Sequence, residues 1–571
     1  MKKPFPLLLL LTAAGAAAIA YFIPAAFRPL GIPDEFRYAV IPRAMLESGD
    51  WITPRLLGQL YFEKPVFGYW MIAASQAIFG ITAFALRLPM VLATFLAALG
   101  FAHMVRRHTR EEVFSSLTLG FYLGGSVLIY FLGVCAVLDS LLTLFTTLLS
   151  ITVFAGVTTR NVRHKYLYLI FAGFFAGLAF LTKGPIGLVL PALGIGAFLV
   201  WSGRWKYFWQ IPALLIIPAL ITVLPWSLAI HRADSDFWNY FIIVEHFQRF
   251  AEQKSGQHAE VWWYFLALFP VVFLPGLLGA IPCALRLKLR DYREMLSDDL
   301  VKFCICSVVL PVAFLSCSSG KLITYILPAA GFFTILEAQV IYECYRMYPD
   351  WVKKLASFWI IFAKFVLIIG GVGAIFLCAW GKSRYGFRLP GLEEFLFFTG
   401  LAAALGAALL QMSAKKTIRF RLAVFALALA LPAAAAQALL PHNLSDNKFP
   451  EKDLEILLSQ LPAQENIRFA TNRRFMHAVS YVSGVDQITL IGTPGEMWYS
   501  HGRLTDAGEK SFCIPYSDCP ALLKECRENG TALVVIFRQK DADDFNFGTP
   551  ADRELSSGQL RMLIFTGENK L

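Results

Sequence analysis

Charged side chains are scarce in this sequence. Asp, Glu, Lys and Arg make up 16% of its 571 residues, whereas soluble domains average about 25%. Hydrophobic residues reach 57%, the mean hydropathy is +0.57, and the apolar residues fall in long runs. These values exclude an ordinary soluble protein and predict a polytopic α-helical membrane protein. The net charge of +11 comes from short basic clusters between apolar runs, which is not a pattern of nucleic-acid binding.

Several motifs of soluble enzymes are also missing. The sequence contains no phosphate-binding loop, dinucleotide fingerprint or nucleophile elbow, and we expect no nucleotide cofactor. It shows no internal repeat and no low-complexity segment apart from alanine-rich apolar runs. The ten cysteines have no metal-ligand spacing. Only Cys513, Cys519 and Cys526 lie in the polar C-terminal part, where two of them could pair outside the cytoplasm.

Apolar segments of membrane-spanning length follow one another through residues 1–440. The first begins after Lys2 and Lys3 and is long enough to be an uncleaved span rather than a signal peptide. The shorter run 66–80 predicts a re-entrant or interfacial helix. We predict about thirteen spans, near residues 5–27, 84–105, 113–131, 136–157, 166–182, 184–201, 207–230, 263–285, 300–318, 322–342, 356–380, 394–412 and 420–440.

Basic residues occupy every second loop, and this alternation predicts the orientation of the chain. The basic loops would face the cytoplasm. An odd number of spans then places two long loops, at about 28–83 and 231–262, on the opposite side together with residues 441–571. In a bacterium that side is the periplasm. Residues 441–571 contain more polar residues and strand-like runs at 467–470, 488–491, 532–537 and 562–565, which predict a mixed α/β domain.

The loop from Gly31 to Tyr69 is unusually rich in functional groups. Acidic and basic residues alternate with aromatic ones, and four prolines divide the loop into short pieces. A plain connector needs only a few polar residues. We therefore interpret this loop as a device that holds something polar at the membrane surface rather than as a solvated linker.

Ionisable residues elsewhere map to the same side of the membrane as this loop. Each one costs about 3 kcal/mol near membrane depth and therefore needs a partner or a purpose. Taken singly they have ordinary explanations, such as a helix N-cap for Asp139 or a snorkelling anchor for Lys183. Together they predict one cavity that holds both carboxylates and cations. The residues concerned are Asp139, Lys183, Glu245, His246, Arg249, Lys321 and Tyr325.

Carboxylates and cations at a lipid–water boundary suit a particular chemistry. The cations would bind phosphate, and the carboxylates would orient an acceptor or stabilise a cationic sugar transition state. Nucleotide donors are absent outside the cytoplasm, so this topology favours a lipid-linked sugar donor.

Six stretches of the chain together resemble one known family. They are PDEFRYAVIPRAMLESGDWITPRLLGQLYFEKPVFGYW from Pro33, AVLDS at 136–140, FLTKG at 180–184, LPWSLAI at 224–230, DFWNYFIIVEHFQRF at 236–250 and GKLITYILP at 320–328. In these stretches the chain resembles the bacterial lipid A aminoarabinose transferases, GT-C-type glycosyltransferases related to protein O-mannosyltransferases. The similarity covers roughly residues 30–330, and the later spans agree by topology only. Cys135 and Ser140 depart from the family pattern, which usually has Tyr before Ala-Val-Leu-Asp-Pro.

The resemblance implies transfer of 4-amino-4-deoxy-L-arabinose from undecaprenyl phosphate to a phosphate of lipid A, which would give resistance to polymyxin and cationic peptides. It implies catalytic roles for Asp34 and Asp139. Glu63 and His246 would lie beside a divalent metal such as zinc, although two ligands do not make a site. The implied ligands of the donor phosphate are Arg37, Tyr38, Tyr61, Lys64, Arg249 and Tyr325, and those of the sugar or acceptor are Glu35, Lys183 and Lys321.

The resemblance and the charge pattern of the loops also predict the location and the partners of the protein. We expect a monomer in the bacterial inner membrane, with the site and the C-terminus facing the periplasm. Its partners would be the undecaprenyl-linked aminosugar, lipid A or lipopolysaccharide, and membrane lipids, but no nucleic acid.

Two alternatives remain open at this point. A relative could move another sugar, such as galactosamine or a hexose, to lipid A or to another acceptor. A lipid flippase or transporter would instead place charges at the membrane midplane and show inverted repeats with broken helices.

Overall fold

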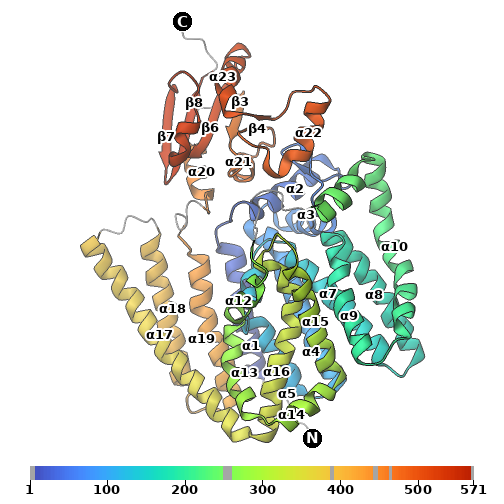
Figure 1. The fold of residues 1–571 in the computed structure, drawn as a ribbon. Coiled ribbons are helices and arrows are strands. Elements are labelled where there is room, and N and C mark those ends of the chain that lie inside the picture. Colours follow the sequence, from blue (N-terminus) through green and yellow to red (C-terminus); the bar gives the residue numbers. More distant parts are fainter. Residues whose placement is uncertain (1–6, 249–259, 386–390, 442–447, 462–465, 567–571) are drawn as a thin grey trace.

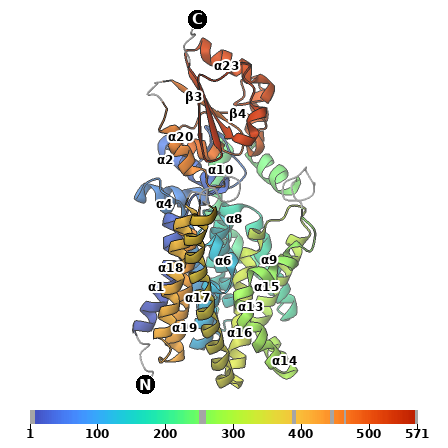
Figure 2. The same ribbon diagram turned by 90° about the vertical axis from the view of Figure 1, so that its left-hand side faces the viewer.

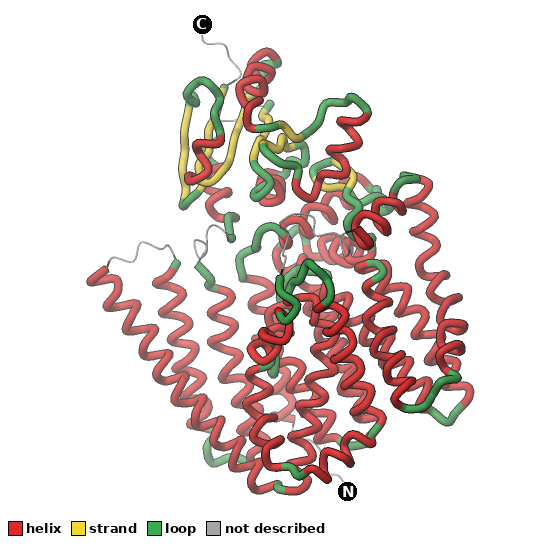
Figure 3. The backbone as a smooth tube through the Cα atoms, in the orientation of Figure 1, coloured by secondary structure: helices red, strands yellow, loops and turns green. Residues whose placement is uncertain are grey.

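The computed structural model describes residues 7–248, 260–385, 391–441, 448–461 and 466–566. A bundle of helices carries a smaller domain of strands and helices at one end (Figures 1 and 3). Helix α1 (Leu7–Phe27) begins at the opposite end of the bundle from that domain, as the view turned by 90° also shows (Figure 2).

Each predicted span falls on one helix or on two consecutive helices. Within the described residues, nine helices are long and apolar enough to cross a membrane, and the pair α12–α13, bent by 85°, would add a tenth. Apart from the helices of the first long loop and of the C-terminal domain, the helices after α1 are α4 (Ala83–Thr109), α5 (Glu112–Gly124), α6 (Val127–Leu132), α7 (Asp139–Thr158), α8 (Val162–Lys183), α9 (Ile186–Trp201), α10 (Tyr207–Ala233), α12 (Tyr264–Val272), α13 (Leu274–Arg286), α14 (Leu289–Ser297), α15 (Asp299–Ser316), α16 (Leu327–Met347), α17 (Pro349–Tyr385), α18 (Leu392–Met412) and α19 (Ile418–Ala438).

Helix α7 lies at the centre of the bundle and is the most enclosed candidate span, with 83% of its apolar window buried. It packs against α4, α8, α9 and α16, whereas α17, α18 and α19 form a group at one side that joins the bundle mainly through α1 and α16 (Figure 1). Because α7 begins at Asp139, the fold places that carboxylate at the end of its central helix.

The first long loop is folded rather than extended. It contains α2 (Asp34–Ser48), a hairpin of β1 (Arg55–Leu56) and β2 (Gln59–Leu60), and α3 (Phe67–Phe79), which confirms the helix predicted near 66–80. Leu57 and Gly58 form the two-residue hairpin turn, and both have the positive φ that such turns require. Figure 1 shows α2 between the bundle and the C-terminal domain. The second long loop contains a π-helix, η1 (Asn239–Gln248).

The C-terminal domain is built on a six-stranded sheet in the order β5-β4-β3-β6-β8-β7. The first four strands in this order are parallel, and β8 and β7 extend them antiparallel. The four predicted strand runs are confirmed, but β5 and β7 were missed because β5 has two residues and β7 is polar. The strands are β3 (Ile467–Thr471), β4 (Ile488–Ile491), β5 (Cys513–Ile514), β6 (Ala532–Arg538), β7 (Arg553–Ser557) and β8 (Leu560–Phe565).

Four helices complete this domain: α20 (Glu451–Leu458), α21 (Met476–Ser483), α22 (Trp498–Asp506) and α23 (Cys519–Glu528). The sequence-based boundary at residue 440 lies between the end of α19 and the start of α20. Cys513, Cys519 and Cys526 are buried free thiols, so the structure shows no disulfide among them.

Candidate functional site

Asp139 and Lys183 form an ion pair where α7 begins and α8 ends. Nζ of Lys183 lies 2.8 Å from Oδ1 of Asp139, and only 16% and 9% of the two side chains are exposed. The same ammonium group lies 5.2 Å from the centre of the Tyr325 ring. Leu138, and not Asp139, holds the N-cap position of α7. Asp139 is therefore paired across two helices rather than acting as a helix cap.

A tight turn at Gly184 brings the second long loop to this pair. Gly184 has a φ of +78°, and a Cβ at this position would lie 2.7 Å from the Phe241 ring and 2.9 Å from Nε2 of His246. Nδ1 of His246 is 2.6 Å from the carbonyl oxygen of Phe241, which makes it the protonated nitrogen. Burial lowers the pKa of His246, and Lys64 lowers it further.

The Tyr-Phe-Glu-Lys segment meets the second long loop from the other side. Nζ of Lys64 lies 3.1 Å from Oε1 of Glu245, and the Tyr61 hydroxyl donates to Oε2 of Glu63 at 2.9 Å. Burial and the Glu245 carboxylate raise the pKa of Glu63 to about 7, against the opposing effect of Lys64. Lys64 is thus paired with Glu245, whereas Glu63 accepts a hydrogen bond from the Tyr61 hydroxyl.

Tyr38 connects these groups to the start of α2. The Arg37 guanidinium lies over its ring at 5.1 Å and forms an ion pair with Asp34. Burial raises the pKa of Tyr38, and the carboxylates of Asp34, Asp139 and Glu63 raise it further. The start of α2 thus forms a charged centre of Asp34, Arg37 and Tyr38.

Two residues of the C-terminal domain complete this centre, and the sequence analysis did not find them. Glu496, in the short helix η3 (Gly495–Met497), forms ion pairs with Arg37 and with His477 of α21 and lies 3.4 Å from the Tyr61 hydroxyl. No motif marks either residue. Their one signal is position: each follows a parallel strand, at the sheet edge where open α/β sheets bind ligands.

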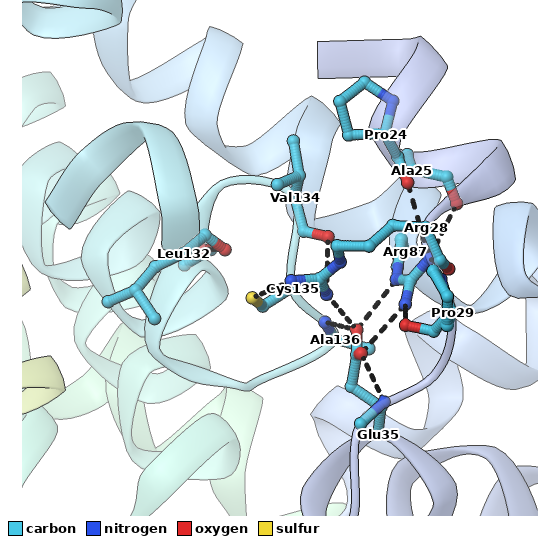
Figure 4. Close-up of polar contacts among 12 residues, drawn as sticks. Pro24, Ala25, Arg28, Pro29, Glu35, Arg87, Leu132, Val134, Cys135 and Ala136 are labelled. Atoms are coloured by element: carbon cyan, nitrogen blue, oxygen red, sulfur yellow. Dashed lines mark hydrogen bonds and ion pairs between the residues drawn. The ribbon is translucent and has the colours of Figure 1, made fainter. Parts of the chain in front are cut away.

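Glu35, which was expected to bind the sugar or acceptor, lies in a buried cluster of charged side chains and backbone groups. Its carboxylate is buried and accepts hydrogen bonds from the guanidinium groups of Arg28 and Arg87 and from the backbone N–H groups of Gly31 and Ala136 (Figure 4). These bonds occupy both oxygens. Glu35 thereby ties the start of α2, which carries Asp34, to the segment that leads into Asp139.

Lys321 is likewise held by its own surroundings. It is buried, and its ammonium group donates to the backbone carbonyl oxygens of Glu260 and Ser318. These contacts fix a turn, and the described residues show no contact between Lys321 and the Asp139–Lys183 pair. Arg249 lies outside the described residues.

The comparisons with known proteins identify the family of the chain. The family model for dolichyl-phosphate-mannose-protein mannosyltransferase matches residues 7–241. The undecaprenyl phosphate-alpha-4-amino-4-deoxy-L-arabinose arabinosyl transferase of Aeromonas salmonicida is 31% identical over 96% of this chain and 97% of its own length. The protein of the same name from Pseudomonas aeruginosa strain LESB58 is 31% identical over 94% of this chain and 95% of its own length.

The chain belongs to this arabinosyl transferase family. Its fold also matches the crystal structure of ArnT from Cupriavidus metallidurans bound to undecaprenyl phosphate, with a TM-score of 0.78, 20% identity and 98% coverage of both chains. These findings confirm the predicted family and the GT-C-type fold with a C-terminal sheet domain. They also favour a glycosyltransferase over the flippase or transporter.

The metal expected from the resemblance does not fit the side chains of this arabinosyl transferase. Protein zinc sites use at least three protein ligands as a rule. Within the described residues, no group of three or more His, Cys, Asp or Glu side chains converges to hold a metal. We therefore assign no step of the reaction to a metal.

Proposed function

We propose that this protein transfers 4-amino-4-deoxy-L-arabinose from undecaprenyl phosphate to a phosphate of lipid A at the periplasmic face of the bacterial inner membrane. The observation that carries the proposal is the meeting of both long loops with the ends of α7 and α8, in a chain of this family. Lys64 pairs with Glu245, Lys183 pairs with Asp139, and His246 lies against the turn at Gly184, while Arg37 pairs with Asp34. The product would bear extra positive charge and bind polymyxin and other cationic peptides less well.

The cations of the site would neutralise the leaving phosphate. Lys64 lies in the first long loop, and Lys183 at the end of α8 is ready to pair with an anion beside Asp139. An oxygen of the lipid A phosphate would attack C1 of the sugar. The bond from C1 to the undecaprenyl phosphate oxygen would break, and that phosphate would leave with the electron pair.

The aspartates would act on the sugar. A lipid A phosphate is already ionised at neutral pH, so the reaction needs no strong general base. Half of the Asp34 side chain is exposed, against 9% for Asp139. We propose that Asp34 orients the acceptor and stabilises the positive charge that develops at C1 of the sugar. Asp139 would stabilise the same charge from the enclosed side of the site. Both would suit an aminosugar.

The two departures from the family pattern point inward and do not argue for another sugar. Sγ of Cys135 lies 3.1 Å from Nη1 of Arg28, in the cluster around Glu35. Oγ of Ser140 donates to the carbonyl oxygen of Leu132 at 3.0 Å. Because both side chains serve contacts within the protein, aminoarabinose remains the sugar that we propose.

Mass spectrometry of lipid A tests this function. Expression in a strain that lacks its own enzyme but makes the donor should add the mass of one or two aminoarabinose residues to lipid A. A mass increase that corresponds to galactosamine or a hexose would support the alternative sugar, and an unchanged lipid A would contradict the proposal.

The variant Asp34→Asn tests the assignment within the site. It should keep the fold, because Asp34 is half exposed, and should lower aminoarabinose addition at least 100-fold. Glu47→Gln is the matched control on the same helix, since the Glu47 side chain is exposed and lies at the far end of α2. Full transfer by Asp34→Asn would remove Asp34 from the mechanism.

A further inference from the structure

We propose that Glu496 and His477 of the C-terminal domain are positioning residues of the transfer reaction, which hold Arg37 in place beside Asp34. This inference rests on the proposed function, because Asp34 must act in transfer for its position to matter. It assigns a catalytic contribution to a domain that lies more than four hundred residues after the loop it serves.

Four side chains in contact with one another connect the sheet domain to Asp34. His477 Nε2 contacts Oε1 of Glu496, the other oxygen of Glu496 contacts Nη1 of Arg37, and Nη2 of Arg37 contacts Asp34. Side-chain exposure is 50% at Asp34, 13% at Arg37, 15% at Glu496 and 1% at His477. The inner end of the series is therefore enclosed by protein, and the outer end is open to substrate.

The sheet domain holds Glu496 rigidly. Gly495 has a φ of +56°, which turns the chain immediately before Glu496, and Pro494 occupies the N-cap position of the short helix η3. His477 lies in the first turn of α21, directly after β3. Burial opposes ionisation, but Arg37 and His477 together hold the pKa of Glu496 well below its usual range. Glu496 thus remains a charged acceptor fixed to the frame of the sheet.

Arg37 depends on this acceptor for its orientation. The guanidinium has two carboxylate partners, one on each side, and it also lies over the Tyr38 ring. A fork held by two carboxylates has a fixed plane, because each oxygen takes a separate N–H group. Without Glu496, the Arg37 guanidinium would have Asp34 as its only carboxylate partner, and the two side chains could rotate together. The Asp34 carboxylate would then no longer be held in one position.

A second ion pair in the same interface provides a matched control. Arg43, also on α2, contacts Asp486 and the backbone oxygens of Ser480 and Tyr481 in the C-terminal domain. This pair docks the domain on α2 but has no contact with Asp34 or Arg37 among the described residues. Loss of docking and loss of positioning can therefore be separated by comparing Glu496→Gln with Asp486→Asn.

The experiment measures transfer by purified full-length protein with the undecaprenyl-linked aminosugar and lipid A. Glu496→Gln should lower kcat about 10- to 100-fold with little change in the KM for the donor, because a displaced catalytic group slows the chemical step. Glu496→Asp should recover part of the rate. His477→Phe should also lower kcat. Asp486→Asn should keep kcat within about twofold of wild type, with any cost appearing in the melting temperature.

Two results would overturn the inference. One is a wild-type rate in Glu496→Gln while wild-type protein is active. The other is an equal loss of kcat in Glu496→Gln and Asp486→Asn with equal losses of melting temperature, which would mean docking alone. A wild-type protein that transfers no aminoarabinose would instead contradict the proposed function.

Discussion

Three acidic residues of the first long loop have three different environments. Asp34 is half exposed beside Arg37, Glu35 is buried under two guanidinium groups, and Glu63 is hydrogen-bonded to Tyr61 near a second carboxylate. The sequence places all three in one loop on one side of the membrane. It does not separate their roles, because two of the partners of Glu35, Arg87 and Ala136, lie 52 and 101 residues away along the chain.

Glu35 predicts a large effect on stability. Glu35→Ala leaves Arg28 and Arg87 buried without their shared carboxylate, and breaking such a cluster costs about 3–5 kcal/mol. We expect a much lower melting temperature in detergent and poor accumulation in the membrane. Glu47→Gln, whose exposed side chain is only loosely paired with Arg43, should change stability by less than about 0.5 kcal/mol. Similar melting temperatures for both variants would contradict the role of Glu35.

Glu63 predicts a pH dependence of stability. Burial and Glu245 raise its pKa to about 7, with Glu496 acting in the same direction and Lys64 and Arg37 opposing. Between its ordinary pKa and about 7 the folded state binds more protons than the unfolded state, so the stability contribution of Glu63 falls as the pH rises through this window. Glu63→Gln should flatten the fall in melting temperature between pH 5 and pH 8. An unchanged slope would show that Glu63 is already ionised at pH 5.

At the scale of single elements, helix ends and breaks position the site. Asp139 begins α7, Lys183 ends α8, and the turn at Gly184 receives the second long loop. Hydropathy predicted these helices and the side on which their ends lie. It did not predict that residues 113–131 divide into α5 and α6 at Gly125, or that α12 and α13 bend by 85°. Composition predicts the length of a membrane span. A break within the span depends on packing against neighbouring helices, which hydropathy does not predict.

The Gly184 turn yields a prediction at this scale. Gly184→Ala adds a Cβ to a backbone with positive φ and forces it against Phe241 and His246. The strain costs about 1–2 kcal/mol, and displacement of the second long loop should reduce transfer at least tenfold. Gly203→Ala is the control, because Gly203 has a φ of +68° and open space around its Cβ position. It should lose similar stability from strain but keep its transfer rate.

At the scale of the molecule, the C-terminal domain and the bundle act as one unit. Arg37 and Arg43 of α2 both reach carboxylates of the domain, Arg503 of α22 contacts Asp234 at the end of α10, and the Ser500 hydroxyl donates to Leu60. The sequence predicted a mixed α/β domain on the same side as the charged loops. It could not place the domain on the site, because no motif in residues 441–571 identifies a ligand.

A charge swap tests this coupling. Asp234→Arg or Arg503→Asp alone should lower the melting temperature of the whole protein, and the double swap should restore it. The Arg503 side chain is about half exposed, so we expect a coupling free energy of about 1 kcal/mol. Two separate unfolding transitions, or a double swap no better than either single change, would show that the two parts unfold independently.

The contact between Arg37 and Glu496 also has a consequence for biogenesis. Helix α2 reaches the membrane early in translation, but Glu496, the carboxylate partner of Arg37, is translated 459 residues later. The half-made protein can insert all of its spans and still be catalytically silent. A nonsense codon between residues 441 and 495, after the last spanning helix, would therefore leave a fully membrane-integrated but inactive product, and bacteria that carry such an allele should regain sensitivity to polymyxin.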